Sequence, residues 1–281
     1  MPSKDLVQTL AAAEKIENLI ERFKDYSGII GWYVADEPDK ANVSDEALQK
    51  YYQTIKKSSA DCPVFINYNW CGINEGSLPV GGHGSTDLMF LDVYPFSDWG
   101  IDAPLEKYAY STWLGNKIAA ERSRTQMMWL QTYGYCDGLR EPNAQEYENM
   151  VWQSLIFGTR GLACFTERPM SKSLWEREGV VHAKIKKMEG IMFANDFKGI
   201  ASQKAVKVGV NHAIWSSGGK YYLLFANQKY ESFPFVIDLK TLCGREFKTA
   251  EDFFGGDKIE IKNGILNIQA APAATGTYII Y

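Results

Sequence analysis

The stretch "GWYVADEP", residues 31–38, decides how the rest of the chain is interpreted. Its first residues form an apolar run typical of strands that are buried on both faces, as in parallel sheets. The run then ends, without a polar transition, on Asp36 and Glu37, and Pro38 fixes the backbone directly after the two acids. The pattern therefore predicts a buried strand with a pair of carboxylic acids at its carboxyl end.

Strands and helices alternate around this stretch as far as about residue 195. Apolar residues at helical spacing predict a helix over 8–25 before it. After it we expect four further strands, at 63–70, 87–95, 126–135 and 161–169, and four further helices, over 44–59, 104–123, 143–159 and 172–195. Such alternation implies parallel strands joined by right-handed crossovers, which fits a doubly wound sheet and an eight-fold barrel equally well.

The pattern changes after residue 200. Short apolar runs such as "KYYLLFANQ" and "FPFVIDL" follow one another, and "SSGG" at 216–219 and the Asn263–Gly264 pair are turn signals of β-hairpins. We therefore predict two domains, an α/β domain over 1–198 and a small antiparallel β-sandwich over 199–281.

Composition excludes several classes of function. The 281 residues are 46% hydrophobic with a net charge of -4, which argues against a nucleic-acid partner. No apolar run reaches the roughly 18 residues that a membrane span needs. The five cysteines lack C-x-x-C spacing, the three histidines are far apart, and no G-x-G-x-x-G or P-loop motif occurs. We therefore expect no metal, no cofactor and no disulfide framework.

Polar and aromatic side chains gather where the predicted strands end. In barrels the active site is built at the carboxyl ends of the strands, so five such ends together predict one pocket, although any single acid could instead cap a helix. Besides the two acids of the opening stretch, the candidates are Asn67, Tyr68, Trp70, Asp92, Tyr94, Trp99, Gln131, Tyr133 and Glu167.

The two adjacent acids suggest a chemistry. Alternation along a strand places Asp36 and Glu37 on opposite sides, so one can face the pocket while the other braces backbone or ligand. A carboxylic acid with apolar walls has a raised pKa and can donate a proton near neutrality. Cleavage of a glycosidic bond requires such a donor.

Four strand segments resemble a known family. "GWYVADEP", "DLMFLDVYP", "MMWLQTYG" and "GLACFTERP" are similar to the second half of (β/α)8 glycoside hydrolases related to clan A, whose strand 4 carries the general acid in an Asn-Glu-Pro or Asp-Glu-Pro motif. The resemblance implies an incomplete TIM-type barrel with a C-terminal sandwich and a carbohydrate substrate. It makes Glu37 the acid/base candidate, places Asp92 and Tyr94 where the family contacts its ligand, and favours a secreted or periplasmic protein, although this chain shows no signal-peptide core. We further expect Asp36 and Asp92 to orient substrate or water.

The chain departs from that family in two ways. The family's nucleophile is a glutamate at the end of strand 7, but "WLQTYGY" offers Gln131, whose amide cannot form a glycosyl ester. The first three strands have no counterpart, which leaves an open sheet edge. The chain is then a fragment, or a second copy of it covers the edge, or the fold is more open than a barrel.

Several mechanisms stay open at this point. The second acid could be Asp92, Glu167 or Glu141. Alternatively the substrate supplies its own nucleophile, as with N-acetylhexosaminidases, in which Asp36 would orient the acetamido group and Tyr133 would help. A catalytically inactive carbohydrate-binding relative is a rival from another class, and a metal-dependent hydrolase is disfavoured because the strand ends lack histidine.

Overall fold

A computed structural model describes most of the chain. Its described residues are 4–38, 40–41, 43–69, 84–96, 103–134, 138–202 and 209–281, without the side chains of 4–13 and 201–202. The predicted alternation is confirmed over these ranges. The chain divides into two compact units, Met1–Val93 with Leu114–Trp129, and Tyr94–Trp113 with Leu130–Tyr281.

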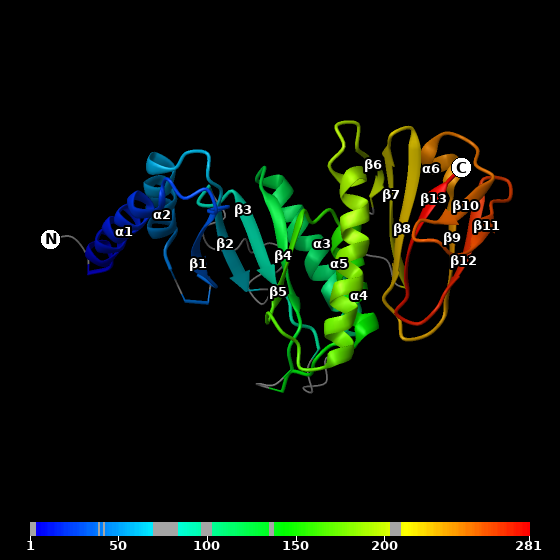
Figure 1. The fold of residues 1–281 in the computed structure, drawn as a ribbon, viewed down its shortest axis with the longest axis horizontal. Coiled ribbons are helices and arrows are strands. Elements are labelled where there is room, and N and C mark those ends of the chain that lie inside the picture. Colours follow the sequence, from blue (N-terminus) through cyan, green and yellow to red (C-terminus); the bar gives the residue numbers. More distant parts are fainter. Residues whose placement is uncertain are drawn as a thin grey trace. The chain divides into compact units, whose positions relative to one another are not determined.

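The first unit carries most of a parallel sheet. It contains the helices α1 (Lys4–Phe23) and α2 (Asp45–Ser58) and the strands β1 (Trp32–Asp36), β2 (Val64–Asn69) and β3 (Leu88–Asp92), together with most of β4 (Thr125–Gln131). The pairings β1–β2, β2–β3 and β3–β4 are all parallel. In Figure 1, α1 and α2 lie side by side next to β1. The strand "GWYVADEP" thus forms as predicted and ends on Asp36.

Strand register gives this sheet two different faces. Val64 and Ile66 are fully buried on the helix-covered face, where Val64 packs with Ile20 of α1 and Ile55 of α2. The opposite face carries a row of aromatic rings, one from each strand, with neighbouring ring centroids 5.3 to 5.5 Å apart. The row consists of Tyr33, Phe65, Phe90 and Trp129. Tyr33, on the edge strand β1, is 45% exposed, so this face is open at that edge.

The second unit contains further α/β elements and all the antiparallel strands. Its helices are α3 (Pro104–Glu121, shared with the first unit), α4 (Ala144–Ile156), α5 (Lys172–Met192) and α6 (Leu239–Cys243). Strand β5 (Gly161–Phe165) completes the five-stranded order β1-β2-β3-β4-β5. Both β4 and β5 end earlier than expected, so Tyr133 and Glu167 lie in the loops that follow the strands.

The predicted β-sandwich is confirmed. One sheet has the order β11-β10-β13-β8-β7-β6 and the other consists of β12 and β9. Buried residues of both sheets, such as Leu223, Phe235 and Leu266, form one hydrophobic core. The strands are β6 (Lys198–Ser202), β7 (Val210–Ser217), β8 (Lys220–Asn227), β9 (Phe233–Asp238), β10 (Thr249–Asp252), β11 (Lys258–Glu260), β12 (Ile265–Ala270) and β13 (Thr275–Ile280).

The two predicted hairpin turns have different outcomes. Gly218 and Gly219 both have positive φ and join the paired strands β7 and β8, as expected. Asn263 and Gly264 also form a tight turn, but β12 pairs with β9 and not with β11. This turn therefore connects the two sheets of the sandwich, because the apolar side chains of β12 are buried against β9 and the shared core.

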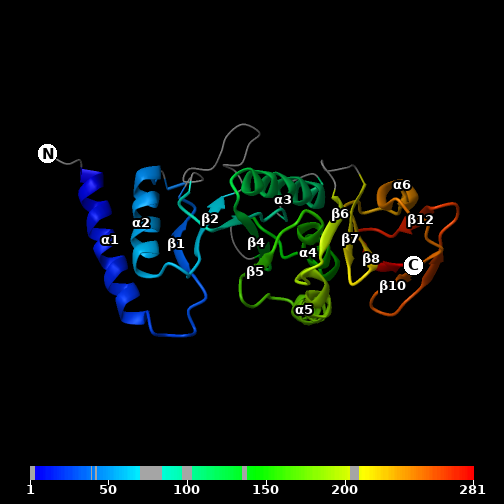
Figure 2. The same cartoon turned by 90° about the horizontal axis from the view of Figure 1, so that it is seen from above.

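Helix α4 ties the α/β elements of the second unit to the sandwich. It contacts α5 and also β7 and β8 (Figure 2). Its Asn149 side chain donates to the backbone oxygens of Asn227 and Ala273, and Trp152 Nε1 donates to Thr277 Oγ1 at 3.0 Å. The predicted boundary at residue 198 falls inside this unit and stays a proposal about domains. None of the helices among the described residues has the length and apolar composition to cross a bilayer.

Candidate active site

The carboxylate of Asp36 is held by two neighbours on the open face of the sheet. Tyr33 donates its hydroxyl to Asp36 Oδ1 at 2.6 Å, and Asn67 Nδ2 donates to the same oxygen at 3.0 Å. Burial and the carboxylate of Asp36 raise the pKa of Tyr33, so its hydroxyl remains a donor. These two bonds fix the Asp36 side chain, which suits an orienting role better than proton transfer.

Glu37 has an unusual backbone conformation directly after the strand. Its φ of 43° lies in the left-handed region, which is uncommon for glutamate. The Glu37 N–H donates to the backbone oxygen of Asn67 at 2.9 Å, and the Glu37 oxygen accepts from the N–H groups of Lys40 and Ala41. These backbone hydrogen bonds therefore fix the direction in which the Glu37 side chain projects from the main chain.

The two acids lie on the same side of the sheet, contrary to the expectation from alternation. Asn69 Nδ2 donates to Glu37 Oε1, and Asn67, which binds Asp36, shares its face of β2 with Asn69 because they are two residues apart. The pairing of β1 with β2 shifts register between Tyr33 and Ala35. This bulge and the left-handed Glu37 break the alternation on which the prediction rested.

Asp92 of β3 joins this group. It is 5% exposed, and its Oδ1 has no hydrogen-bond partner among the described residues. Asn67 and Glu37 lie close enough to act on its pKa. The structure thus brings together four of the predicted residues, Asp36, Glu37, Asn67 and Asp92.

The pKa values of the two neighbouring acids are shifted in opposite directions. Burial and then the charge of Glu37 raise the pKa of Asp92 to about 7. Burial also raises the pKa of Glu37, but hydrogen bonds from Asn69, Lys40 and Asp92 outweigh it and hold that pKa below its ordinary value. The expectation of a raised pKa for Glu37 is therefore wrong, because polar donors surround it in place of apolar walls. Below about pH 7 Asp92 is therefore protonated while Glu37 is ionised.

The electrostatic coupling of Glu37 and Asp92 also bears on their roles. In glycosidases the two catalytic carboxyl groups are about 5 Å apart when they retain configuration and farther apart when they invert it. Two acids that act on each other's pKa suit one shared proton better than two separate catalytic roles.

Other predicted residues of the first unit have different placements. Tyr68 is fully buried, and it points to the helix-covered face because it lies between Asn67 and Asn69 in the strand. We correct its assignment from substrate binding to the core. Trp70 and Trp99 lie outside the described residues.

In the second unit, Tyr94 and Tyr133 belong to one aromatic cluster with Phe165. The ring of Tyr94 lies 5.8 Å from that of Phe165 at an interplanar angle of 23°, and Tyr133 meets both rings edge-on. Tyr133 is buried, whereas Phe165 is exposed. The ring of Phe165 is therefore the accessible member of this cluster.

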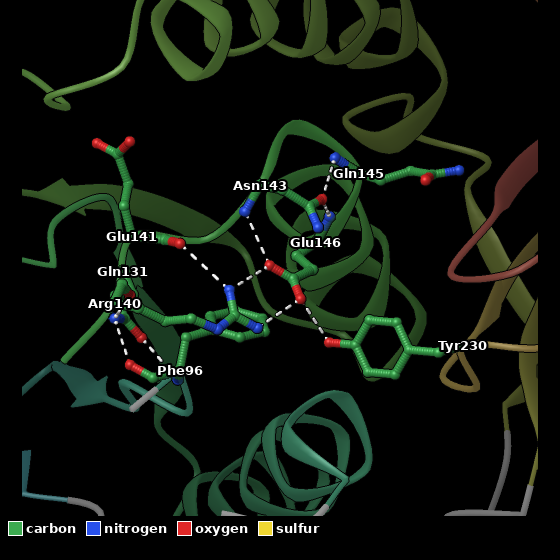
Figure 3. Close-up of polar contacts among 8 residues, drawn as sticks. All are labelled: Phe96, Gln131, Arg140, Glu141, Asn143, Gln145, Glu146 and Tyr230. Carbon is green, nitrogen blue, oxygen red and sulfur yellow. Dashed lines mark hydrogen bonds and ion pairs between the residues drawn. The ribbon is translucent and has the colours of Figure 1, made fainter. Parts of the chain in front are cut away.

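Gln131 has a structural role. Its fully buried amide accepts from the Phe96 N–H at 3.0 Å and donates to the backbone oxygens of Phe96, Tyr133 and Arg140. Figure 3 shows the hydrogen bonds of Gln131 to Phe96 and Arg140 next to the Arg140–Glu146 pair. Gln131 was predicted to contact the substrate, but none of its side-chain atoms is exposed to do so.

The buried carboxylate of Glu146 forms an ion pair with the partly exposed Arg140 and has further hydrogen-bond donors. Arg140 binds both oxygens of Glu146, at 2.7 and 2.8 Å, and Tyr230 of the sandwich donates to Glu146 Oε1 at 2.6 Å (Figure 3). Burial raises the pKa of Glu146, but Arg140 and Tyr230 outweigh it and lower that pKa. Glu146 is therefore held ionised as part of the fold.

The remaining acids after β4 and β5 differ in their use. Glu167 is exposed, and its contact with substrate stays a prediction. Glu141 binds the N–H groups of Met170 and Ser171 before α5. Among the described residues, no three histidine, cysteine, aspartate or glutamate side chains lie together in a way that could hold a metal ion.

Three residues of these groups were not singled out from the sequence. Tyr33 could not be selected from the sequence, because the bulge that places it on the same side as Asp36 cannot be recognised in the pattern of apolar and polar residues. Asn69 and Phe165 end their strands and could have been found by the same reasoning that selected Asn67 and Tyr94.

Comparisons with known proteins agree with this architecture. The sequence matches no family model, and no curated protein matches it significantly. Among solved structures, AmyP in complex with maltose has a TM-score of 0.61 at 10% identity over 96% of this chain and 67% of AmyP. A GH27 β-L-arabinopyranosidase from Geobacillus stearothermophilus has 0.62 at 9% identity, over 96% of this chain and 61% of that enzyme. A GH30 endoxylanase from Clostridium papyrosolvens has 0.56 at 12%, over 97% and 71%.

These structures define the class of fold. The chain has the fold of glycoside hydrolases related to clan A, with part of a (β/α) barrel followed by an antiparallel β-sandwich. It spans about two thirds of the length of the solved proteins that it matches. Its structural neighbours are hydrolases that act on carbohydrates.

Proposed function

We propose that the protein is a glycosidase whose proton donor is the Glu37–Asp92 pair. The observation that carries the proposal is a buried acid with a pKa of about 7 next to an ionised glutamate at the carboxyl ends of β1 and β3. Opposite pKa shifts on neighbouring acids are typical of catalytic sites. The fold shared with glycoside hydrolases supports carbohydrate as the substrate class.

The pair would work by passing one proton to the glycosidic oxygen. Glu37 is the more exposed member, with 24% of its side chain accessible, so we assign the transfer itself to Glu37. Asp92 keeps the proton near neutrality and releases it through Glu37 as the bond between the anomeric carbon and the oxygen breaks. Asp36, held by Tyr33 and Asn67, would orient the sugar, and water completes the hydrolysis.

Replacement of Glu37 by glutamine tests this proposal. We expect Glu37→Gln to lower kcat at least about 100-fold on a panel of aryl glycosides that includes an N-acetylhexosaminide, because the amide cannot relay a proton. Binding of the same sugars should remain. Glu46→Gln, an exposed acid at the start of α2, is the matched control and should retain full activity.

Two outcomes would contradict the proposal. Full turnover by Glu37→Gln would remove the pair from catalysis. A native protein that binds sugars but hydrolyses none of the panel would support the non-catalytic alternative, which the absence of a carboxylate at Gln131 favours.

A further inference from the structure

A pocket at the start of α5 is separate from the site around Glu37 and Asp92. It has a volume of about 470 Å³ and is lined by Arg168, Pro169, Met170, Ser171, Lys172 and Trp175. Trp175 is 52% exposed and Met170 is exposed as well. Among the described residues, the indole has no aromatic, cation–π or hydrogen-bond partner, so one of its surfaces is available to a ligand.

The pocket also carries unused positive charge. No ion pair or side-chain hydrogen bond of Arg168 occurs among the described residues, whereas Lys172 pairs with Glu176 at 3.4 Å. A guanidinium group presents several donors in one plane and matches pairs of hydroxyl oxygens or a carboxylate. An exposed indole matches the apolar face of a pyranose ring.

The backbone that lines the pocket is held by hydrogen bonds to Glu141. Glu141 Oε1 accepts from the Met170 N–H at 2.5 Å, and both carboxylate oxygens accept from the Ser171 N–H. Figure 3 shows the carboxylate of Glu141 pointing away from the Arg140–Glu146 pair. The backbone oxygen of Glu141 accepts a hydrogen bond from the Arg140 guanidinium, so the main chain of Glu141 is also held in place. A pocket whose wall is held in this way loses little entropy when a ligand binds.

From these features we infer that the pocket is a carbohydrate-binding site, in which a pyranose ring stacks on Trp175 and its oxygen atoms accept hydrogen bonds from Arg168. The inference rests on the proposed function for its choice of ligand class. It assigns a carbohydrate contact to the second unit, separate from the Glu37–Asp92 pair of the first unit. Glu141 is then a positioning residue for this pocket.

Calorimetric titration of the full chain with xylotriose, maltotriose and digalacturonate tests the inference. We expect at least one of them to bind, and Trp175→Ala to weaken that binding about tenfold or more, since stacking is lost. Trp175→Phe should restore much of the affinity because a ring remains, which separates lost stacking from misfolding. Phe193→Ala, an exposed ring at the other end of α5, is the matched control and should bind like the native protein.

Arg168→Gln distinguishes the kind of sugar. A larger loss of affinity with digalacturonate than with the neutral trisaccharides would indicate recognition of a uronic acid, and an equal loss of affinity would indicate recognition of hydroxyl groups.

Unchanged affinity in Trp175→Ala, or no binding by any of the three sugars, would overturn the inference. Titration of Glu37→Gln separates the two proposals: Trp175-dependent binding can persist when hydrolysis is absent, and Glu37-dependent hydrolysis can persist when Trp175 proves irrelevant.

Discussion

At the scale of single residues, two acids of the same chemical type receive different properties from their surroundings. Asp92 is enclosed and keeps an oxygen without a partner, whereas Glu37 is surrounded by donors from Asn69 and Lys40. Desolvation therefore dominates for Asp92, and hydrogen bonding dominates for Glu37. The proton that the proposed reaction needs is stored on the residue that is less able to reach the substrate.

This arrangement predicts the pH dependence of activity. With the native pair, kcat/KM should fall as pH rises above about 7, when the proton shared with Asp92 is lost. In Asp92→Asn, Glu37 titrates alone with its lowered pKa, so the alkaline limb should move at least about one pH unit toward acid. Asp61→Asn, an exposed acid of the same unit, is the control. An unchanged limb in Asp92→Asn would contradict the sharing of one proton.

At the scale of elements, helix α4 begins with a capping box. Asn143 Oδ1 accepts from the N–H groups of Gln145 and Glu146, and the Glu146 side chain accepts from the Asn143 N–H at 2.8 Å. The same Glu146 also binds Arg140 and Tyr230. The start of α4 is therefore joined both to the preceding loop and to the sandwich.

Removal of this cap should destabilise the protein measurably. We expect Asn143→Ala to lower the free energy of unfolding by about 1 kcal/mol, because two N–H groups lose their acceptor. Urea denaturation followed by circular dichroism measures the change. Asn195→Ala replaces an exposed asparagine beyond α5 and should leave the unfolding curve where it is. Equal curves for Asn143→Ala and the native protein would show that the cap is dispensable.

At the scale of the whole molecule, buried acids make stability depend on pH. Glu178 of α5 is 4% exposed, its Oε1 has no partner among the described residues, and burial followed by the charge of Glu141 raises its pKa to about 7. The folded state thus holds this proton more tightly than the unfolded state. The resulting stability is complete below the ordinary glutamate pKa of 4.5 and is lost as pH rises through about 7.

Comparison of unfolding at pH 5 and pH 8 tests this account. We expect the native protein to be less stable at pH 8, and Glu178→Gln to reduce the difference because its side chain cannot ionise. Asp92 contributes a difference of the same sign, so some dependence should remain. Glu176→Gln, an exposed acid on the same helix, serves as the control. A native-like pH dependence in Glu178→Gln would contradict the assignment.

The sequence by itself determined the alternation of strands and helices, the change to an antiparallel module and the acids at the strand ends. These depend on local periodicity and on composition, which a single sequence displays. Only the tertiary structure decided that Asp36 and Glu37 lie on one side of the sheet, that Tyr68 and Gln131 are buried, and that the pKa of Asp92 is raised. Those properties depend on a bulge in β1, on the register of β2 and β3, and on which groups exclude water from a carboxylate. All of them arise between segments that are distant in the sequence.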